Sequence, residues 1–266
     1  MNRLHIIYED DQILVCQKEA GMPVQTASFR TTDLTDLVRR HLMEKKESDG
    51  TVPYLGIVHR LDQPVRGLVV FALNEKAASD LSAQAAGKNT GSTMKKEYLA
   101  LVRTADMDLS GSVEKKLLTG QEEVLLEDYL VRDPKSNRSG IAKKGEKGAK
   151  YAALRCRVIE DPQNEIYQAA CFVFAEEMAI LREQKEQYAV LRIRLLTGRH
   201  HQIRVQLSHA GIPIIGDRKY GEEAEANPGD ASKKISYPAL CAWRLELKHP
   251  GTAERMSFEL VKRQSI

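Results

Sequence analysis

The stretch TVPYLGIVHRLDQPVRGLVVFALN, residues 51–74, is the most informative part of the chain for predicting its fold. It holds two apolar runs, Tyr54–Val58 and Leu68–Leu73, separated by the polar segment His59–Pro64. Short apolar runs on either side of a proline-containing segment predict two buried strands with a charged connection. An acid at position 62, between two buried strands, is partly removed from water. It therefore needs a cation to stay ionised.

Further strands and helices are predicted on both sides of this stretch. The opening segment, residues 6–18, has the pattern of two short strands around a turn. Thr32 or Asp33 can cap a helix that follows, and Asn74 can cap a second one. The first helix presents one apolar face, made of Leu34, Leu37, Val38 and Leu42.

The second half of the chain is also predicted to combine strands and helices. Alternating residues predict strands at 97–103 and 191–195, and a helix follows Gly198. Residues 137–150 form a basic loop or hairpin, and a last strand pair brackets the turn at residues 249–251. The sum predicts an α+β fold with one extended sheet.

Composition narrows the class of protein but does not name a function. The chain has 266 residues, of which 42% are hydrophobic and 29% charged, which is typical of a folded, soluble protein of one or two domains. A net charge of +3 permits binding to nucleic acid without requiring it. The four cysteines form no CxxC pair, the start is unlike a signal peptide, and no apolar run reaches about 18 residues. We expect a cytoplasmic protein without a membrane span.

Five segments, in order along the chain, resemble the motifs of one enzyme family. GIVHRLDQPVRGLVVFALN is similar to the active-site motif of the RluA-type RNA pseudouridine synthases, which contains HRLD and then a glycine and an apolar run. The others are LHIIYEDDQILVCQKEAGMPVQ, KKEYLALV, LLTGRHHQIRVQLSHAGIPIIGDRKYG and YPALCAWRLELKHP. Together they cover most of the chain, so the resemblance is more specific than any single short pattern.

The resemblance implies a fold, a reaction and a partner. It implies a single catalytic domain over residues 1–266, without the N-terminal S4 module of many relatives. Its sheet would be mixed and mostly antiparallel, flanked by helices and loops, with an RNA cleft across it. The substrate would be a uridine in a structured RNA, either ribosomal or transfer RNA, and we expect a monomer. Breaking the N1–C1′ bond and joining C5 to C1′ involves no redox step, so no cofactor and no metal are expected.

Three residues match the family's catalytic positions. Asp62 matches the catalytic aspartate, although the sequence leaves open whether it attacks covalently or removes a proton. The resemblance implies that Tyr98 packs against a uracil flipped out of its stack. It also implies that Arg204 pairs with Asp62 and keeps that carboxylate ionised.

Further residues are candidates for contact with RNA. Arg60 would fill the vacated stack or bind phosphate, with a surface salt bridge as its alternative. Arg199 lies beside the predicted start of a helix, which is a plausible phosphate site, and His201 and Gln202 belong to the same motif. Lys143 and Lys144 would add a backbone contact, unless this charge run is only a solvated face. A segment at residues 160–190 looks longer than the family core and is predicted to form a short helix or an extended hairpin.

Three other functions fit the sequence less well. His200, His201 and His209 suggest a metal site, but His201 and His209 are about two helical turns apart, and no acid or cysteine completes the set. An RNA-binding protein without catalysis would keep the basic surface, yet it would not need Asp62, Tyr98 and Arg204 together. A hydrolase that uses Ser208 and His209 would lack the nucleophile-elbow sequence.

Overall fold

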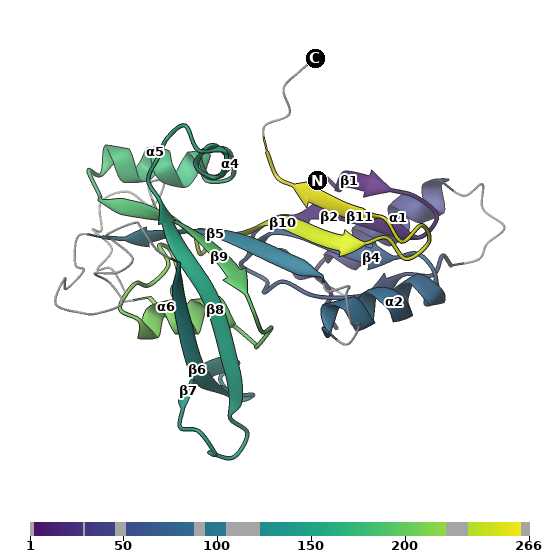
Figure 1. Cartoon of the computed structure of the whole chain (residues 1–266). Coiled ribbons are helices and arrows are strands. Elements are labelled where there is room, and N and C mark those ends of the chain that lie inside the picture. Colours follow the sequence, from purple (N-terminus) through teal and green to yellow (C-terminus); the bar gives the residue numbers. More distant parts are fainter. Residues whose placement is uncertain are drawn as a thin grey trace. The chain divides into compact units, whose positions relative to one another are not determined.

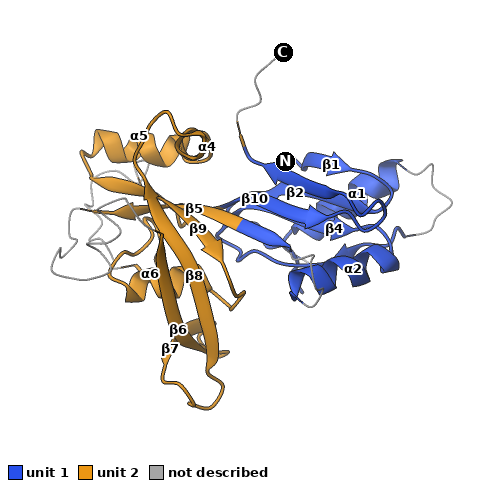
Figure 2. Cartoon of the chain, in the orientation of Figure 1, with its two compact units in different colours: residues 1–96, 242–260 blue, residues 97–241, 261–266 orange. Residues whose placement is uncertain are grey.

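The structure is a computed structural model. It describes residues 3–28, 30–45, 52–87, 94–104, 123–221 and 234–261. The chain divides into two compact units, the first made of residues 1–96 and 242–260 and the second of residues 97–241 and 261–266 (Figure 2). Both units combine helices with antiparallel strands (Figure 1), which confirms the predicted α+β class. The prediction of a single catalytic domain stays a prediction.

The first unit is a small sheet with two helices. Its strands run in the order β1-β2-β4-β10, with β11 paired to β10 and β3 paired to β4. The elements are β1 (His5–Glu9), β2 (Ile13–Lys18), α1 (Leu34–Lys45), β3 (Gly56–Ile57), β4 (Arg66–Ala72), α2 (Glu75–Ala85), β10 (Leu240–Lys248, within this unit from Ala242) and β11 (Arg255–Glu259). At the centre β2 and β4 pair antiparallel, with Val15 opposite Val70 and Cys16 opposite Val69, and all four are fully buried.

The helices of this unit begin where the sequence predicts. Asp33 Oδ1 accepts from the N–H of Asp36 at 2.9 Å, and Asn74 Oδ1 accepts from the N–H of Ala77 at 2.9 Å. These side chains satisfy backbone donors that have no partner inside the helix. The strand before Asp62 is shorter than predicted, because β3 spans only two residues and Tyr54 is 42% exposed. An apolar run alone does not fix strand length, since only part of this one finds a partner strand.

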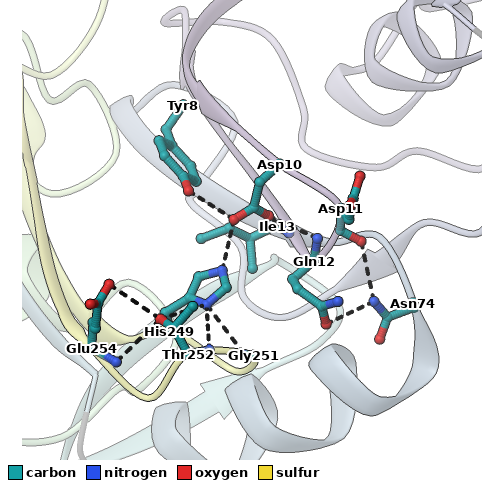
Figure 3. Close-up of polar contacts among 10 residues, drawn as sticks. All are labelled: Tyr8, Asp10, Asp11, Gln12, Ile13, Asn74, His249, Gly251, Thr252 and Glu254. Carbon is teal, nitrogen blue, oxygen red and sulfur yellow. Dashed lines mark hydrogen bonds and ion pairs between the residues drawn. The ribbon is translucent and has the colours of Figure 1, made fainter.

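A polar staple joins two turns of the first unit (Figure 3). His249, which is buried, has its Nε2 2.8 Å from Asp10 Oδ2, and its Nδ1 accepts from the N–H groups of Gly251 and Thr252. Asp10 also accepts from the Tyr8 hydroxyl and from the N–H groups of the β1–β2 turn. The staple therefore ties the β1–β2 turn to the β10–β11 turn, and the predicted terminal strand pair is confirmed.

The second unit has a sheet in the order β5-β9-β8-β6-β7. Its elements are β5 (Lys95–Arg103, within this unit from Glu97), β6 (Val124–Asp133), β7 (Arg138–Ala142), β8 (Lys150–Ile159), α4 (Glu165–Val173), α5 (Ala175–Glu183), β9 (Tyr188–Leu195) and α6 (Gln202–His209). The segment at 160–190 thus contains two helices, and the basic segment at 137–150 lies in a hairpin. No helix in the described parts of the chain is long and apolar enough to span a membrane.

Candidate active site

Asp62 lies in the loop between β3 and β4 of the first unit. The neighbouring side chains of Leu61 and Val65 are 7% and 3% exposed, so they anchor the loop to the core. A turn closes around Gln63 and Pro64, because the Val65 N–H donates to the Asp62 carbonyl at 3.0 Å. Asp62 itself is partly exposed. The loop therefore holds a carboxylate at the protein surface on a backbone that its neighbours fix.

Lys18 fastens this loop to the end of β2, and sequence analysis did not single it out. Although it is a lysine, it is fully buried. Its ammonium donates to the carbonyls of Glu19 at 3.0 Å, Met22 at 2.7 Å and Gln63 at 3.0 Å. A buried charge is tolerated only when it is well hydrogen-bonded. The one signal in the sequence is a lysine at the end of a strand that begins with four apolar residues.

Gln63 adds a second connection between the same two segments. Its carbonyl accepts from the Gly21 N–H at 2.9 Å, and its side-chain amide donates to the Gly21 carbonyl at 3.0 Å. Residues 19–22 and the turn after Asp62 are therefore joined by hydrogen bonds in both directions. Such mutual support preorganises a carboxylate, because the loop cannot move without breaking several bonds at once.

His59 and Arg60 have different surroundings. His59 Nε2 accepts from the Val70 N–H at 3.2 Å, so this ring is a part of the β4 packing. Burial, together with the charge of Lys96, lowers the pKa of His59 well below its ordinary value, so the ring is neutral. Arg60 is exposed, as a residue that contacts RNA would have to be.

Arg204 is buried in the second unit and is held by a partner that sequence analysis did not identify. It projects from α6 with 4% exposure. Its Nε donates to Asp217 Oδ2 and its Nη2 to Asp217 Oδ1, each at 2.7 Å. Asp217, 3% exposed, also accepts from the N–H groups of Lys219 and Tyr220. A bidentate ion pair such as Arg204–Asp217 fixes the plane of the guanidinium.

The three predicted catalytic residues are distributed over both units. Asp62 belongs to the first unit, whereas Tyr98 and Arg204 belong to the second, and the predicted pair of Asp62 with Arg204 stays a prediction. Tyr98 lies on β5 opposite Ile193 of β9 and is 7% exposed. Beside it, Glu97 accepts two hydrogen bonds from Arg192, at 2.8 and 2.6 Å. This ion pair fixes β5 to β9 at the tyrosine.

The residues just before α6 have structural partners of their own. Gln202 Oε1 accepts from the Arg199 N–H and from the Thr197 hydroxyl, and its amide donates to the Ala153 carbonyl. His201 is 7% exposed and has a positive φ of 54°. Arg199 is exposed, and its Nε donates to the Tyr151 carbonyl at 2.8 Å. Of these predicted RNA contacts, Arg199 is therefore the one whose side chain lies at the surface.

The basic loop, residues 143–149, connects β7 to β8. Lys143, Lys144 and Lys147 are all exposed on it. Glu146 orders the loop, because its carboxylate accepts from the Lys143 N–H at 3.0 Å and its carbonyl accepts from the Ala149 N–H at 3.0 Å. An ordered loop with three exposed ammonium groups can contact a phosphate backbone.

The residues of the alternative functions lie in other arrangements. Ser208 donates to the Tyr220 carbonyl, while His209 Nδ1 lies 3.1 Å from Asp128 Oδ1, so the two side chains engage different partners. Within the described residues, no group of three or more histidine, cysteine, aspartate and glutamate side chains is placed to hold a metal ion.

Comparison with known proteins decides the family. Residues 12–209, which include Asp62, Tyr98 and Arg204, match the family model described as RNA pseudouridylate synthase. The chain belongs to the RNA pseudouridylate synthase family. The predicted membership in the RluA-type group agrees with its similarity to ribosomal large subunit pseudouridine synthases.

Two relatives and one solved structure illustrate the match. The ribosomal large subunit pseudouridine synthase D of Nitrosomonas europaea is 30% identical over 260 residues, which cover 96% of this chain and 61% of the relative. An uncharacterized RNA pseudouridine synthase of Chlorobaculum parvum is 30% identical over 266 residues, which cover 95% of this chain and 69% of the relative. The structure of human RNA pseudouridylate synthase domain containing 4 superposes with a TM-score of 0.65 at 17% identity, over 97% of this chain and 89% of the human one.

Proposed function

We propose that this chain converts a uridine in ribosomal RNA to pseudouridine, with Asp62 as the catalytic carboxylate. The observation that carries the proposal is the loop of Asp62: a partly exposed carboxylate on a backbone fixed by Lys18 and Gln63, within a family match that spans residues 12–209. The reaction needs an ionised carboxylate beside the ribose and a base held outside its stack. Ribosomal RNA is the substrate class named for the relatives, and transfer RNA is the alternative.

The other candidate residues have roles in the same reaction. Tyr98 offers a flat ring and a hydroxyl to the flipped uracil. Arg204 acts as the arginine that keeps the catalytic carboxylate ionised, and Asp217 fixes its orientation. Arg60, exposed next to the carboxylate, fills the vacated stack or binds a phosphate. Whether Asp62 attacks C1′ or removes the 2′ proton is left open.

The decisive experiment replaces one carboxylate oxygen. In the Asp62→Asn variant, tritium release from RNA that contains 5-tritiated uridine should vanish, while the dissociation constant for RNA changes by less than about threefold. Asp11→Asn is the matched control, because it makes the same chemical change at an exposed position of the same unit. Tritium release by Asp62→Asn at the wild-type rate would remove Asp62 from the mechanism.

Binding of RNA by the basic loop has its own test. Replacing Lys143 and Lys144 by glutamine should weaken binding uniformly across RNA sequences. It should also lower the slope of log K against log salt by about 1 for each phosphate that the loop no longer neutralises. Lys76→Gln, on α2 of the first unit, is the control for charge alone. An unchanged salt slope in the double variant would leave this loop outside the interface.

The choice between the two RNA classes needs cells rather than purified protein. Pseudouridines are mapped in ribosomal and transfer RNA from cells that have or lack this chain, and from cells that carry only Asp62→Asn. A single ribosomal position that loses pseudouridine in both mutant strains supports the proposal. Loss confined to transfer RNA would replace the substrate class, and an unchanged map would favour a binding protein without catalysis.

A further inference from the structure

Tyr220 touches β7, α6 and the Arg204–Asp217 pair at the same time. Its hydroxyl accepts from the Ser139 N–H of β7 at 2.8 Å and bonds to His201 Nδ1 at 2.7 Å. Its ring lies under the guanidinium of Arg204, with Cζ 5.1 Å from the ring centroid. All of these residues belong to the second unit.

The backbone of Tyr220 is held as firmly as its side chain. Its N–H donates to Asp217 Oδ1 at 3.3 Å, and its carbonyl accepts from Ser208 of α6. The ring also packs against a small buried cluster of Leu130, Ala152 and Val205, which come from β6, β8 and α6. A ring fixed on so many sides transmits a displacement of its hydroxyl to the groups that it supports.

β7 is the edge strand of its sheet, and Tyr220 connects it to the helix. Ser139 lies opposite Arg132 of β6, and its N–H points away from β6, since it donates to the tyrosine hydroxyl. The Ser139 hydroxyl makes a second connection, to His200 Nδ1 at 2.9 Å. The basic loop begins directly after Ala142, the last residue of β7. A displacement of this loop is therefore transmitted along β7 to the hydrogen bonds of Ser139.

His201, which completes this connection, is neutral. Burial, with the charges of Arg204, His200, Lys219 and Arg132, lowers the pKa of His201 to about 3. His200 stacks on His201 with ring centroids 3.7 Å apart. A neutral His201 can bond to the Tyr220 hydroxyl without placing a second full charge against Arg204.

We propose that Tyr220 is a positioning residue that links RNA binding on the basic loop to the orientation of Arg204. This inference rests on the proposed function of Arg204. RNA bound to the lysines of the loop orders β7, the Ser139 N–H fixes the tyrosine hydroxyl, and the ring holds the guanidinium in place. The basic loop then contributes to the rate of the chemical step as well as to RNA affinity.

The test is a double-mutant cycle of Tyr220→Phe with the triple variant Lys143→Gln, Lys144→Gln, Lys147→Gln. Tyr220→Phe keeps the ring under Arg204 and removes only the hydroxyl. In the wild-type background the triple variant should lower the single-turnover rate at saturating RNA by about 5- to 20-fold and also raise the KM. In the Tyr220→Phe background, where the rate is already low, the same lysine changes should alter only the KM. Tyr151→Phe, which removes a hydroxyl bonded to exposed Glu127, is the matched control with an unchanged rate.

A second readout does not depend on catalysis and separates this inference from the proposed function. Hydrogen–deuterium exchange is measured on peptides covering residues 138–142 and 202–208, with and without RNA. RNA should protect both peptides in the wild type, but only the first in Tyr220→Phe. Equal protection of both peptides in the two proteins, or rate reductions that simply multiply in the cycle, would overturn the link. A wild-type protein that shows the exchange pattern but makes no pseudouridine would instead overturn the proposed function.

Discussion

Arg204 and Asp217 form a buried two-pronged ion pair, with both donor–acceptor distances at 2.7 Å and with side chains that are 5% and 1% exposed. The pair fixes the plane of the guanidinium from the side of Asp217. Its partner residue comes from the turn after α6, thirteen positions further along the chain. The orientation of Arg204, which is proposed to act in catalysis, thus depends on the Asp217 carboxylate, which lies outside the HRLD segment.

Replacing Asp217 by asparagine should therefore destabilise the protein and impair the reaction together. Breaking a buried pair by removing one charge costs about 3–5 kcal/mol, because the remaining charge is left uncompensated. Misplacing a catalytic group by about 1 Å can cost on the order of 100-fold in rate. Urea unfolding measures the first effect and single-turnover pseudouridine formation the second.

Glu123→Gln is the matched control for Asp217→Asn. Glu123 pairs with Arg194 at 2.7 Å, but these side chains are 25% and 45% exposed. Exposed pairs contribute less than about 1 kcal/mol, so the control should unfold near the wild-type urea concentration. Equal effects of the two variants would mean that the Arg204–Asp217 pair has no special role.

Lys18→Met should loosen the loop of Asp62. The variant leaves the carbonyls of Met22 and Gln63 without the ammonium, and a buried polar group without its partner costs about 1–3 kcal/mol. We expect the turnover number to fall at least about tenfold, while RNA affinity stays within about twofold. Lys76→Met, on the surface of α2, should change neither quantity. A normal turnover number in a destabilised Lys18→Met protein would confine Lys18 to stability.

The staple of Asp10 and His249 predicts how stability depends on pH. Burial by itself raises the pKa of Asp10. The N–H groups of Ile13 and Gln12, the Tyr8 hydroxyl and the electrostatic effect of the His249 ring outweigh it, so that the pKa lies below its ordinary value of 3.8. A carboxylate with a lower pKa in the folded protein contributes stability above pH 3.8, and this contribution disappears as the pH falls through the folded value.

Asp10→Asn isolates this contribution. The free energy of unfolding should be lower than that of the wild type at pH 6, and the difference should shrink as the pH falls below 3.8. Asp11→Asn, on the same turn but with an exposed side chain, supplies the comparison. A constant difference between Asp10→Asn and wild type over this range would show that the ionised form of Asp10 does not stabilise the fold.

Gly67→Ala should prevent stable folding. Gly67 lies near the start of β4, right after the Asp62 loop, with a φ of +135°, and an added Cβ would lie 2.5 Å from the backbone nitrogen and oxygen of Ala242. Because backbone atoms cannot move aside cheaply, we expect the free energy of unfolding to fall by more than about 4 kcal/mol. Gly140→Ala in β7 is the control, since its Cβ meets nothing within 4 Å. Thermal unfolding of both variants checks the contrast, and a well-folded Gly67→Ala protein would contradict it.

The linear sequence was enough to predict the fold class, the family and the position of the candidate carboxylate. Asn74 could be identified as one helix cap, and Thr32 or Asp33 as the other, because capping is local. The α+β class followed from the spacing of apolar residues along the chain. HRLD and the later motifs could be recognised because their residues lie next to one another in sequence. For residues 160–190 the sequence predicted one short helix or an extended hairpin, and the structure has two helices there.

The distant groups that hold these residues in place became visible only in the three-dimensional structure. No local pattern predicts that Lys18 donates to the carbonyl of Gln63 or that Asp217 accepts a bidentate pair from Arg204. Nor does one predict that the Tyr220 hydroxyl accepts from an N–H of β7. These contacts form because strand pairing and the packing of α6 remove polar groups from water. A buried polar group costs free energy unless it is hydrogen-bonded. Which partner each one meets depends on the path of the whole chain, so a single linear sequence does not reveal it.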